Sequence, residues 1–287
     1  MRPKSLFDTP LFKVLKTAHD KYALKVQLNL FYRTDYFYGN DEFSLADVTD
    51  AYKAEFEASS DWLKLAFHAK EEFPDYPHVN ATYQDVFDLF KMTEKEVFRF
   101  AGEKSFTYAV CLHWLPISKE GVKALYDCGV RLMDATYGKI SEYNGDPNSL
   151  PHGHALRLLN NRQPETRIYT RDTDYAEISN GICAYNHITP EQLPDLCTTE
   201  TVTDKETGMQ FKVYISSDCC LNLEPLNGIE EKFSTLLDKE CLGVCDHEQY
   251  FYEGYFAYQP DFADKIYKMC EIVTENGFEF IFAENLI

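Results

Sequence analysis

The chain has 287 residues, of which 45% are hydrophobic and 15% aromatic, enough to build the core of one large α/β domain or two small ones. Asp and Glu outnumber Lys and Arg by 47 to 28, and the formal net charge of −19 disfavours nucleic acids and membrane surfaces as partners. No apolar stretch approaches the ~18 residues of a membrane span, and the basic start lacks the apolar run of a secretory signal. We therefore expect a cytoplasmic protein.

Strand-like and helix-like segments alternate along the first half of the chain. The strand-like segments place apolar residues at alternate positions, whereas the helix-like segments space them by three or four. The predicted strands cover 22–32, 61–69, 106–114 and 130–138, and the predicted helices cover 43–60, 80–102 and 118–129. Connections this short predict parallel βαβ units.

The pattern changes in residues 140–220, which are polar and rich in Pro, Gly and Asn. Part of this segment predicts a hairpin around "KETG". The helical rhythm returns at 228–240, followed by a helix over 261–277 and a last strand over 278–285. We expect one α/β barrel domain over 1–287, with 140–220 as an inserted β-rich subdomain.

Candidate metal ligands stand at the ends of the predicted strands, where ligands gather in parallel α/β folds. Asp35 follows the first strand and lies among four aromatic rings within residues 31–37. His68 and His113 end the next two strands, and His247 follows a later one. Carboxylate and imidazole are zinc ligands, and a catalytic zinc keeps three protein ligands plus a water. A bound ion also explains an ionised Asp35 among aromatic rings.

Structural alternatives exist for these residues. A histidine at a strand end often only donates to a backbone carbonyl. Asp246 is interpreted as a loop cap or a support for His247, and Glu248 either as a base near a bound water or as an exposed acid. The remaining histidines, including the pair in "PHGH" (151–154), and the nine cysteines without a C-x-x-C pair indicate no further metal site.

Aromatic residues are dense immediately after His247. Seven rings fall within residues 247–262, with Tyr250 and Tyr252 nearest to the histidine, and Trp114 directly follows His113. Aromatic faces beside polar groups suit sugar rings, whose C–H faces stack while their hydroxyls take hydrogen bonds. The alternative is a packed crossover onto the last helix.

The order of three motifs resembles the polysaccharide deacetylase-like superfamily, and in particular a bacterial branch of it. The motifs are "DWLKLAFHAKEEFPDYPHVNATY", "CLHW" and "DHEQYFYEGYFAYQPDFADKI", and the resemblance covers about two thirds of the chain, leaving out 140–220. It implies a distorted (β/α)7-8 barrel of the deacetylase type. It also implies a divalent metal, zinc above others, held by an Asp after the first strand and two His of an H-x-x-x-H motif after the second.

Carried over to this chain, Asp35 matches the first-strand acid and His68 the first metal histidine. The chain departs from the family pattern in several places. Glu72 stands where the second histidine of H-x-x-x-H is expected, and Thr34 stands where a paired Asp precedes the first-strand acid. His113-Trp114-Leu115-Pro116 stands where the family has R-x-P-Y, and His247 lies in "CDH" where the family has L-x-H. His113 takes the place of the missing ligand in our interpretation. The implied metal set is Asp35, His68 and His113.

The resemblance further implies removal of an acyl group from a carbohydrate or similar small substrate. Asp35 or Glu248 would take a proton, and His247, in the position of the family's late histidine, would protonate the leaving amine or alcohol. One alternative is a non-catalytic carbohydrate- or small-ligand-binding protein on the same barrel. Another is a glycoside hydrolase using paired carboxylates among Glu72, Glu248 and Glu253.

Overall fold

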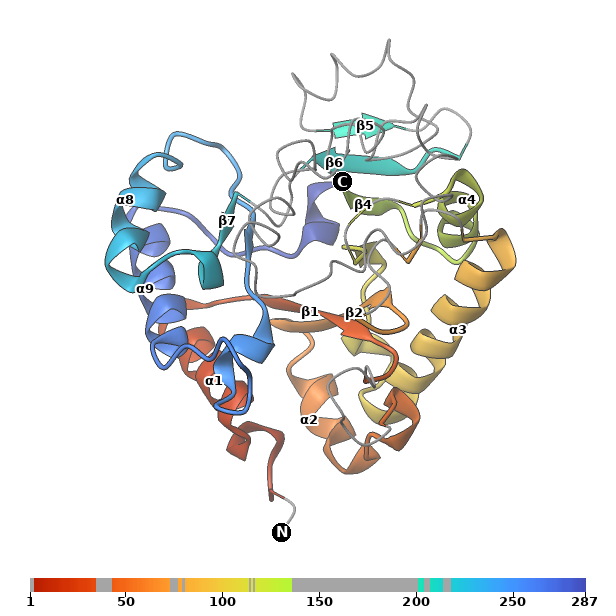
Figure 1. Ribbon diagram of the computed structural model, residues 1–287, viewed down its shortest axis with the longest axis horizontal. Helices are drawn as coiled ribbons and strands as arrows, with labels where there is room; N and C mark the ends of the chain where they lie inside the picture. The colour runs from red at the N-terminus through yellow and green to blue at the C-terminus, as the bar shows by residue number, and fades with distance from the viewer. Residues whose placement is uncertain are drawn as a thin grey trace.

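The computed structural model describes residues 3–34, 43–72, 77–78, 81–113, 115, 117–135, 201–203, 207–213 and 218–287 (Figure 1). The predictions for Asp35, Trp114 and most of 140–220 therefore lie outside the described residues. Among the described residues, no helix combines the length and apolarity that a membrane crossing requires.

The first long element is a helix that the sequence analysis does not predict. Helix α1 (Pro10–Tyr22) begins with Pro10 in its first turn and buries Leu11, Leu15 and Ala18 on one face. It ends at Ala23, whose φ of 58° is left-handed. The strand predicted from residue 22 therefore begins only at residue 26, because Tyr22 belongs to the helix.

The parallel βαβ arrangement predicted for the first half is confirmed. Strand β1 pairs in parallel with β2, and β3 with β4, while two amphipathic helices connect the later strands. Thr82 and Ser118 cap these helices with their side chains, which explains where each one begins. The elements are β1 (Val26–Phe31), β2 (Leu63–Ala69), α3 (Tyr83–Phe100), β3 (Ala109–Val110), α4 (Lys119–Asp127) and β4 (Leu132–Ala135).

The helix predicted over 43–60 is only partly correct. Residues Leu45–Asp47 form a single 3-10 turn, Asp50–Tyr52 form another, and only Lys53–Ala58 form a helix, α2. Between the two turns, Val48 is extended, with ψ of 130°. The apolar spacing thus continues through a segment that is not continuously helical.

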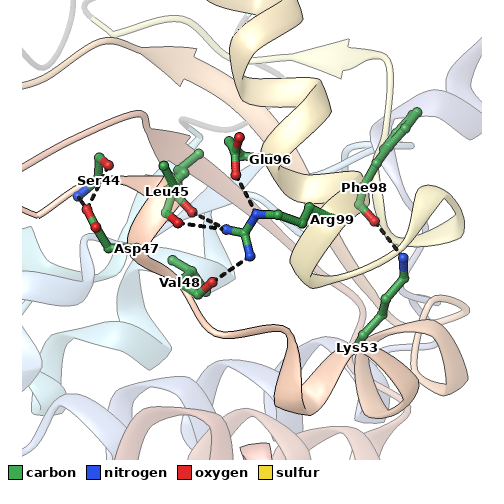
Figure 2. Close-up of polar contacts among 9 residues, drawn as sticks. Ser44, Leu45, Asp47, Val48, Lys53, Glu96, Phe98 and Arg99 are labelled. Carbon is green, nitrogen blue, oxygen red and sulfur yellow. Dashed lines mark hydrogen bonds and ion pairs between the residues drawn. The ribbon is translucent and has the colours of Figure 1, made fainter.

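Arg99 of α3 accounts for this interruption (Figure 2). Its guanidinium donates to the carbonyls of Leu45, Ala46 and Val48 at 2.9, 3.1 and 2.9 Å, and pairs with Glu96 at 2.6 Å. In a continuous helix these carbonyls would accept bonds from amides four residues later. A tertiary contact therefore replaces the local helix.

The predicted hairpin is confirmed, because β5 (Thr201–Thr203) and β6 (Gln210–Val213) pair antiparallel. Strand β6 also pairs in parallel with β4, which places the hairpin in the same sheet as β3 and β4. The segment 140–220 consequently contributes both strands of the hairpin to this four-stranded sheet.

The C-terminal part contains the parallel pair β7 (Cys219–Cys220) and β8 (Val244–Cys245), with helices α8 (Ile229–Ser234) and α9 (Phe262–Glu275). The strand predicted over 278–285 is wrong. Residues Ala283–Leu286 form a 3-10 helix, and Phe282 is buried under the ammonium groups of Lys25 and Lys64. The alternating aromatic residues here pack onto the core without a partner strand.

Five further 3-10 helices complete the regular structure of the described residues. They are Leu6–Asp8, Glu103–Ser105, Leu221–Leu223, Leu226–Gly228 and Glu248–Phe251. Helices α3 and α4 lie together on one side of β1 and β2, and α1, α8 and α9 lie on the other (Figure 1). The core between them is built from side chains such as Leu63, Phe67, Phe90 and Phe233.

The described strands form three sheets, ordered β1–β2, β3–β4–β6–β5 and β7–β8. The first two are joined by a parallel bridge between Leu65 and Phe106 and by the bond from the His113 amide to the His68 carbonyl at 3.4 Å. The parallel order is that of an α/β fold. Closure into a distorted (β/α)7-8 barrel stays a prediction.

Candidate functional site

Two of the predicted ligands lie side by side. His68 is the sixth residue of β2, and His113 follows β3 by three residues, so both stand at the carboxyl ends of adjacent strands. Their ring centroids are 5.2 Å apart. The ring of Phe31, the last residue of β1, contacts both imidazoles edge-on at 4.9 and 5.0 Å. The fold therefore brings together residues 45 positions apart in the chain (113 − 68).

Each imidazole is held by a backbone carbonyl. Nδ1 of His68 bonds the carbonyl of Cys111, and Nε2 of His113 bonds the carbonyl of Glu72 at 2.9 Å. Because a carbonyl only accepts, these nitrogens carry the protons. In the neutral rings, Nε2 of His68 and Nδ1 of His113 then carry the lone pairs. Burial lowers the pKa of His68 to about 4, so its ring is neutral at pH 7.

His78, to which the sequence analysis gives no role, is hydrogen-bonded to the backbone of His68. Its side chain is buried, and Nε2 donates to the carbonyl of His68 at 3.1 Å. Burial lowers the pKa of His78 to about 4. Its own carbonyl accepts the amide of Ser118 at 2.9 Å, which ties the end of β2 to the start of α4. Its role is to hold the backbone that carries His68.

The ends of segment 35–42 are fixed next to this pair. The Thr34 amide donates to the Phe43 carbonyl at 2.8 Å, and the Arg33 amide donates to the Lys70 carbonyl at 2.9 Å. The guanidinium of Arg33 also pairs with Glu71 through two bonds of 2.9 Å. The backbone just before Asp35 is thus attached two residues beyond His68, although Asp35 itself lies outside the described residues.

His247 follows β8 and faces the same region. Its Nδ1 donates to Oδ1 of Asn222 at 2.8 Å, and the Sγ of Cys220 lies 3.7 Å from the same nitrogen. The charge of protonated His247 is close enough to lower the pKa of His68. Tyr250, one of the predicted stacking residues, lies edge-on to His247 with centroids 6.5 Å apart.

Asp246 precedes His247 and accepts its backbone N–H at 3.0 Å through Oδ1. Its Oδ2 is buried and makes no hydrogen bond among the described residues. Burial raises the pKa of Asp246 to about 7, and the charges of His247 and Lys265 oppose that rise only in part. This carboxyl group is therefore partly protonated at neutral pH.

A chain of hydrogen bonds anchors Asn222 behind His247. The backbone carbonyl of Asn222 accepts Nε2 of Gln259 at 2.8 Å, and Oε1 of Gln259 accepts Nζ of the buried Lys265 at 2.8 Å. Lys265 lies on α9, 3.8 Å from Asp261. Sequence reasoning missed these residues because nothing in the sequence indicates that positions so far apart meet behind one histidine.

Three other residues singled out from the sequence, Glu248, Glu253 and Tyr252, are exposed. The side chain of Tyr252 is 47% exposed and is followed by Phe256 at 55%. Together with Tyr258, these residues form an exposed aromatic surface directly after His247.

The donor set fits a divalent metal only in part. Among the described residues, no three His, Cys, Asp or Glu side chains come together in a way that could hold an ion. His68 and His113 supply two imidazoles, and a third ligand has to come from the remainder of the chain, where Asp35 stands. Comparisons with protein-family models, with curated proteins and with solved structures found no match to this chain.

Proposed function

We propose that the protein is a metal-dependent hydrolase that removes an acyl group from a carbohydrate or similar small substrate. The observation that carries the proposal is the pair of imidazoles 5.2 Å apart, each with its N–H on a backbone carbonyl. Metal-binding histidines are oriented in this way, with the second nitrogen left to face the ion. Zinc takes such ligands readily.

Asp35 is the proposed third ligand. Arg33 is bonded to Lys70, and two Cα–Cα steps of about 3.8 Å each limit how far the Cα of Asp35 lies from that of Arg33. The same reasoning holds from Lys70 back to His68. The proposal requires the Asp35 carboxylate to lie within reach of the two imidazoles, and the short connections to Arg33 and Lys70 are compatible with that. Glu72, two residues beyond Lys70, contributes its carbonyl to His113.

When bound, the ion would polarise the acyl carbonyl and lower the pKa of a bound water. His247 donates through Nδ1 to Asn222, which leaves Nε2 as the ring atom that would deliver a proton to the leaving amine or alcohol. Asp35 or Glu248 takes the proton of the attacking water in this scheme. The exposed rings of Tyr252 and Phe256 provide faces on which a sugar stacks.

The exposed aromatic surface also favours a second candidate, a carbohydrate-binding protein without catalysis. The two candidates make different demands on His68 and His113. A hydrolase needs their lone pairs for an ion, whereas a binding protein needs only the rings after His247. A paired-carboxylate glycoside hydrolase has no comparable support, because Glu248 and Glu253, two of its candidate acids, are exposed.

The first experiment measures bound metal. Protein purified without chelator is analysed by inductively coupled plasma mass spectrometry, and zinc affinity is then titrated for the wild type, His68→Gln and His113→Gln. We expect about one zinc per chain, and a loss of affinity of at least roughly 10-fold in each variant. The matched control is His19→Gln, because His19 stacks on Trp62 and bonds the Leu24 carbonyl in the N-terminal helix region.

The second experiment follows acetate release from acetylated oligosaccharides by the zinc-loaded protein. The proposal predicts release that is lost in His247→Gln, while this variant keeps its zinc. Equal zinc affinity in the wild type and His68→Gln would contradict the metal site. Zinc binding without release, together with sugar binding that Tyr252→Ala weakens, would instead favour the carbohydrate-binding protein.

A further inference from the structure

Two cysteine thiols face each other behind His247. Cys220 ends β7 and Cys245 ends β8, and the two residues are register partners in this parallel pair. Register partners project their side chains on the same face, and neighbouring strands lie about 4.8 Å apart. A disulfide requires Cα atoms roughly 4.4–6.8 Å apart. The backbone therefore already holds the two residues at a distance that a disulfide accepts.

The thiols also interact with each other and with the site. Both are reduced and partly exposed, and a side-chain hydrogen bond joins them. The Cys220 thiol donates to Oδ1 of Asn222 at 3.1 Å, the same oxygen that accepts Nδ1 of His247. By contrast, Cys219 points to the opposite face and is buried in the core.

We propose that Cys220 and Cys245 form an oxidative modification site, at which a hydroperoxide converts the two thiols into a disulfide. In the first step, the Cys220 sulfur attacks the terminal peroxide oxygen and the O–O bond breaks. The thiol proton leaves with the other oxygen, as water when the oxidant is hydrogen peroxide and as an alcohol when it is an organic hydroperoxide. The product is a sulfenic acid on Cys220. The Cys245 sulfur then attacks that sulfur, the S–O bond breaks, and the hydroxyl leaves as water with the Cys245 proton.

The surroundings assign the two roles. The hydrogen bond to Cys220, followed by burial, holds the pKa of Cys245 well above its usual value, so Cys245 remains a thiol. The Cys220 sulfur, by contrast, lies 3.7 Å from Nδ1 of His247, on the side of the proposed active site. Cys220 is thus the attacking residue and Cys245 the resolving one.

Oxidation changes the environment of His247. In the reduced protein, Oδ1 of Asn222 accepts hydrogen bonds from the Cys220 thiol and from Nδ1 of His247. The disulfide has no S–H, so Oδ1 keeps the bond from His247 and loses the bond from Cys220. The ring resonances of His247 are expected to shift in NMR spectra. Any effect on hydrolysis rests on the proposed function, but the modification itself is measured without an activity assay.

The test treats the folded full-length chain with hydrogen peroxide, blocks the remaining thiols by alkylation and maps tryptic peptides by mass spectrometry. We expect a linked pair of peptides, lighter by two hydrogens, joining Cys220 to Cys245. Cys241, another partly exposed thiol, provides the internal comparison. The linkage should form at least about 10-fold faster than Cys241 is oxidised.

Three variants separate the steps. Cys241→Ser is the matched control and keeps the linkage, whereas Cys220→Ser loses it. Cys245→Ser stops at the sulfenic acid, which a dimedone adduct on Cys220 reports. The proposal is overturned if both thiols of the wild type remain alkylatable when Cys241 is already oxidised. It is equally overturned if Cys220 is linked to another cysteine.

Discussion

Arg99 offers a quantitative test of how the segment after residues 35–42 is held. Replacing it by Met keeps most of the apolar stem and removes the guanidinium that binds the carbonyls of Leu45, Ala46 and Val48 (Figure 2). The variant also leaves Glu96 without its partner, and the side chain of Glu96 is only 11% exposed. The perturbation thus removes one anchor that joins α3 to the turn Leu45–Asp47 and to Val48 directly after it.

The magnitude follows from the burial of each bond. The bonds to Leu45 and Val48 are partly buried and contribute about 1 kcal/mol each, whereas the exposed bond to Ala46 contributes almost nothing. Loss of the pair with Glu96 costs about another 1 kcal/mol. Arg99→Met should therefore lower the free energy of unfolding by about 3 kcal/mol. Arg99→Lys keeps the positive charge but not the planar guanidinium, which bonds several carbonyls at once. Its loss in the free energy of unfolding should be about half that of Arg99→Met.

Urea unfolding followed by circular dichroism measures this loss. With an m-value of roughly 3 kcal/mol/M, the midpoint falls by about 1 M in Arg99→Met. The control is Arg131→Met, because among the described residues the Arg131 guanidinium donates to the carbonyls of Tyr126 and Val130, both close to it in the chain near the end of α4. A midpoint for Arg99→Met no lower than that of Arg131→Met would refute the assignment of stability to the Arg99 contacts.

The remaining predictions concern Asp246 and Gly102. The pKa of Asp246 is raised to about 7 in the folded protein, so its contribution to stability is full below pH ~4 and is lost as the pH rises to ~7. Asp246→Asn should reduce that decline, measured as urea midpoints between pH 5 and 8, and an unchanged slope would contradict the raised pKa. Gly102 has φ of +87°, and an added Cβ would lie 2.2 Å from Oε1 of Glu57, so Gly102→Ala should cost about 2 kcal/mol. Gly277→Ala, with φ of +84° and open space around it, should cost about half as much in the same assay, and equal losses would exclude the contact with Glu57.

The local sequence pattern was sufficient to predict a helix or strand where that element is stabilised mainly by its own residues. The apolar spacing over 80–102 predicted α3, because Val86, Phe90 and Val97 fall on one buried face of a capped helix. The alternation in 61–69 predicted β2, and the short connections predicted its parallel neighbours. The same reasoning failed at 43–60 and 278–285, where contacts with Arg99 and burial of Phe282 replaced the local preference.

The sequence by itself determined the residue types at the strand ends, and hence that His68 and His113 would meet wherever adjacent parallel strands end at one edge. Only the tertiary structure decided which nitrogen each ring presents, because Cys111 and Glu72 contribute backbone carbonyls that no side-chain pattern reveals. Only the fold placed Asn222 and Cys220 behind His247. The physical reason is that local pattern reports burial and direction, whereas hydrogen-bond partners distant in sequence are set by packing.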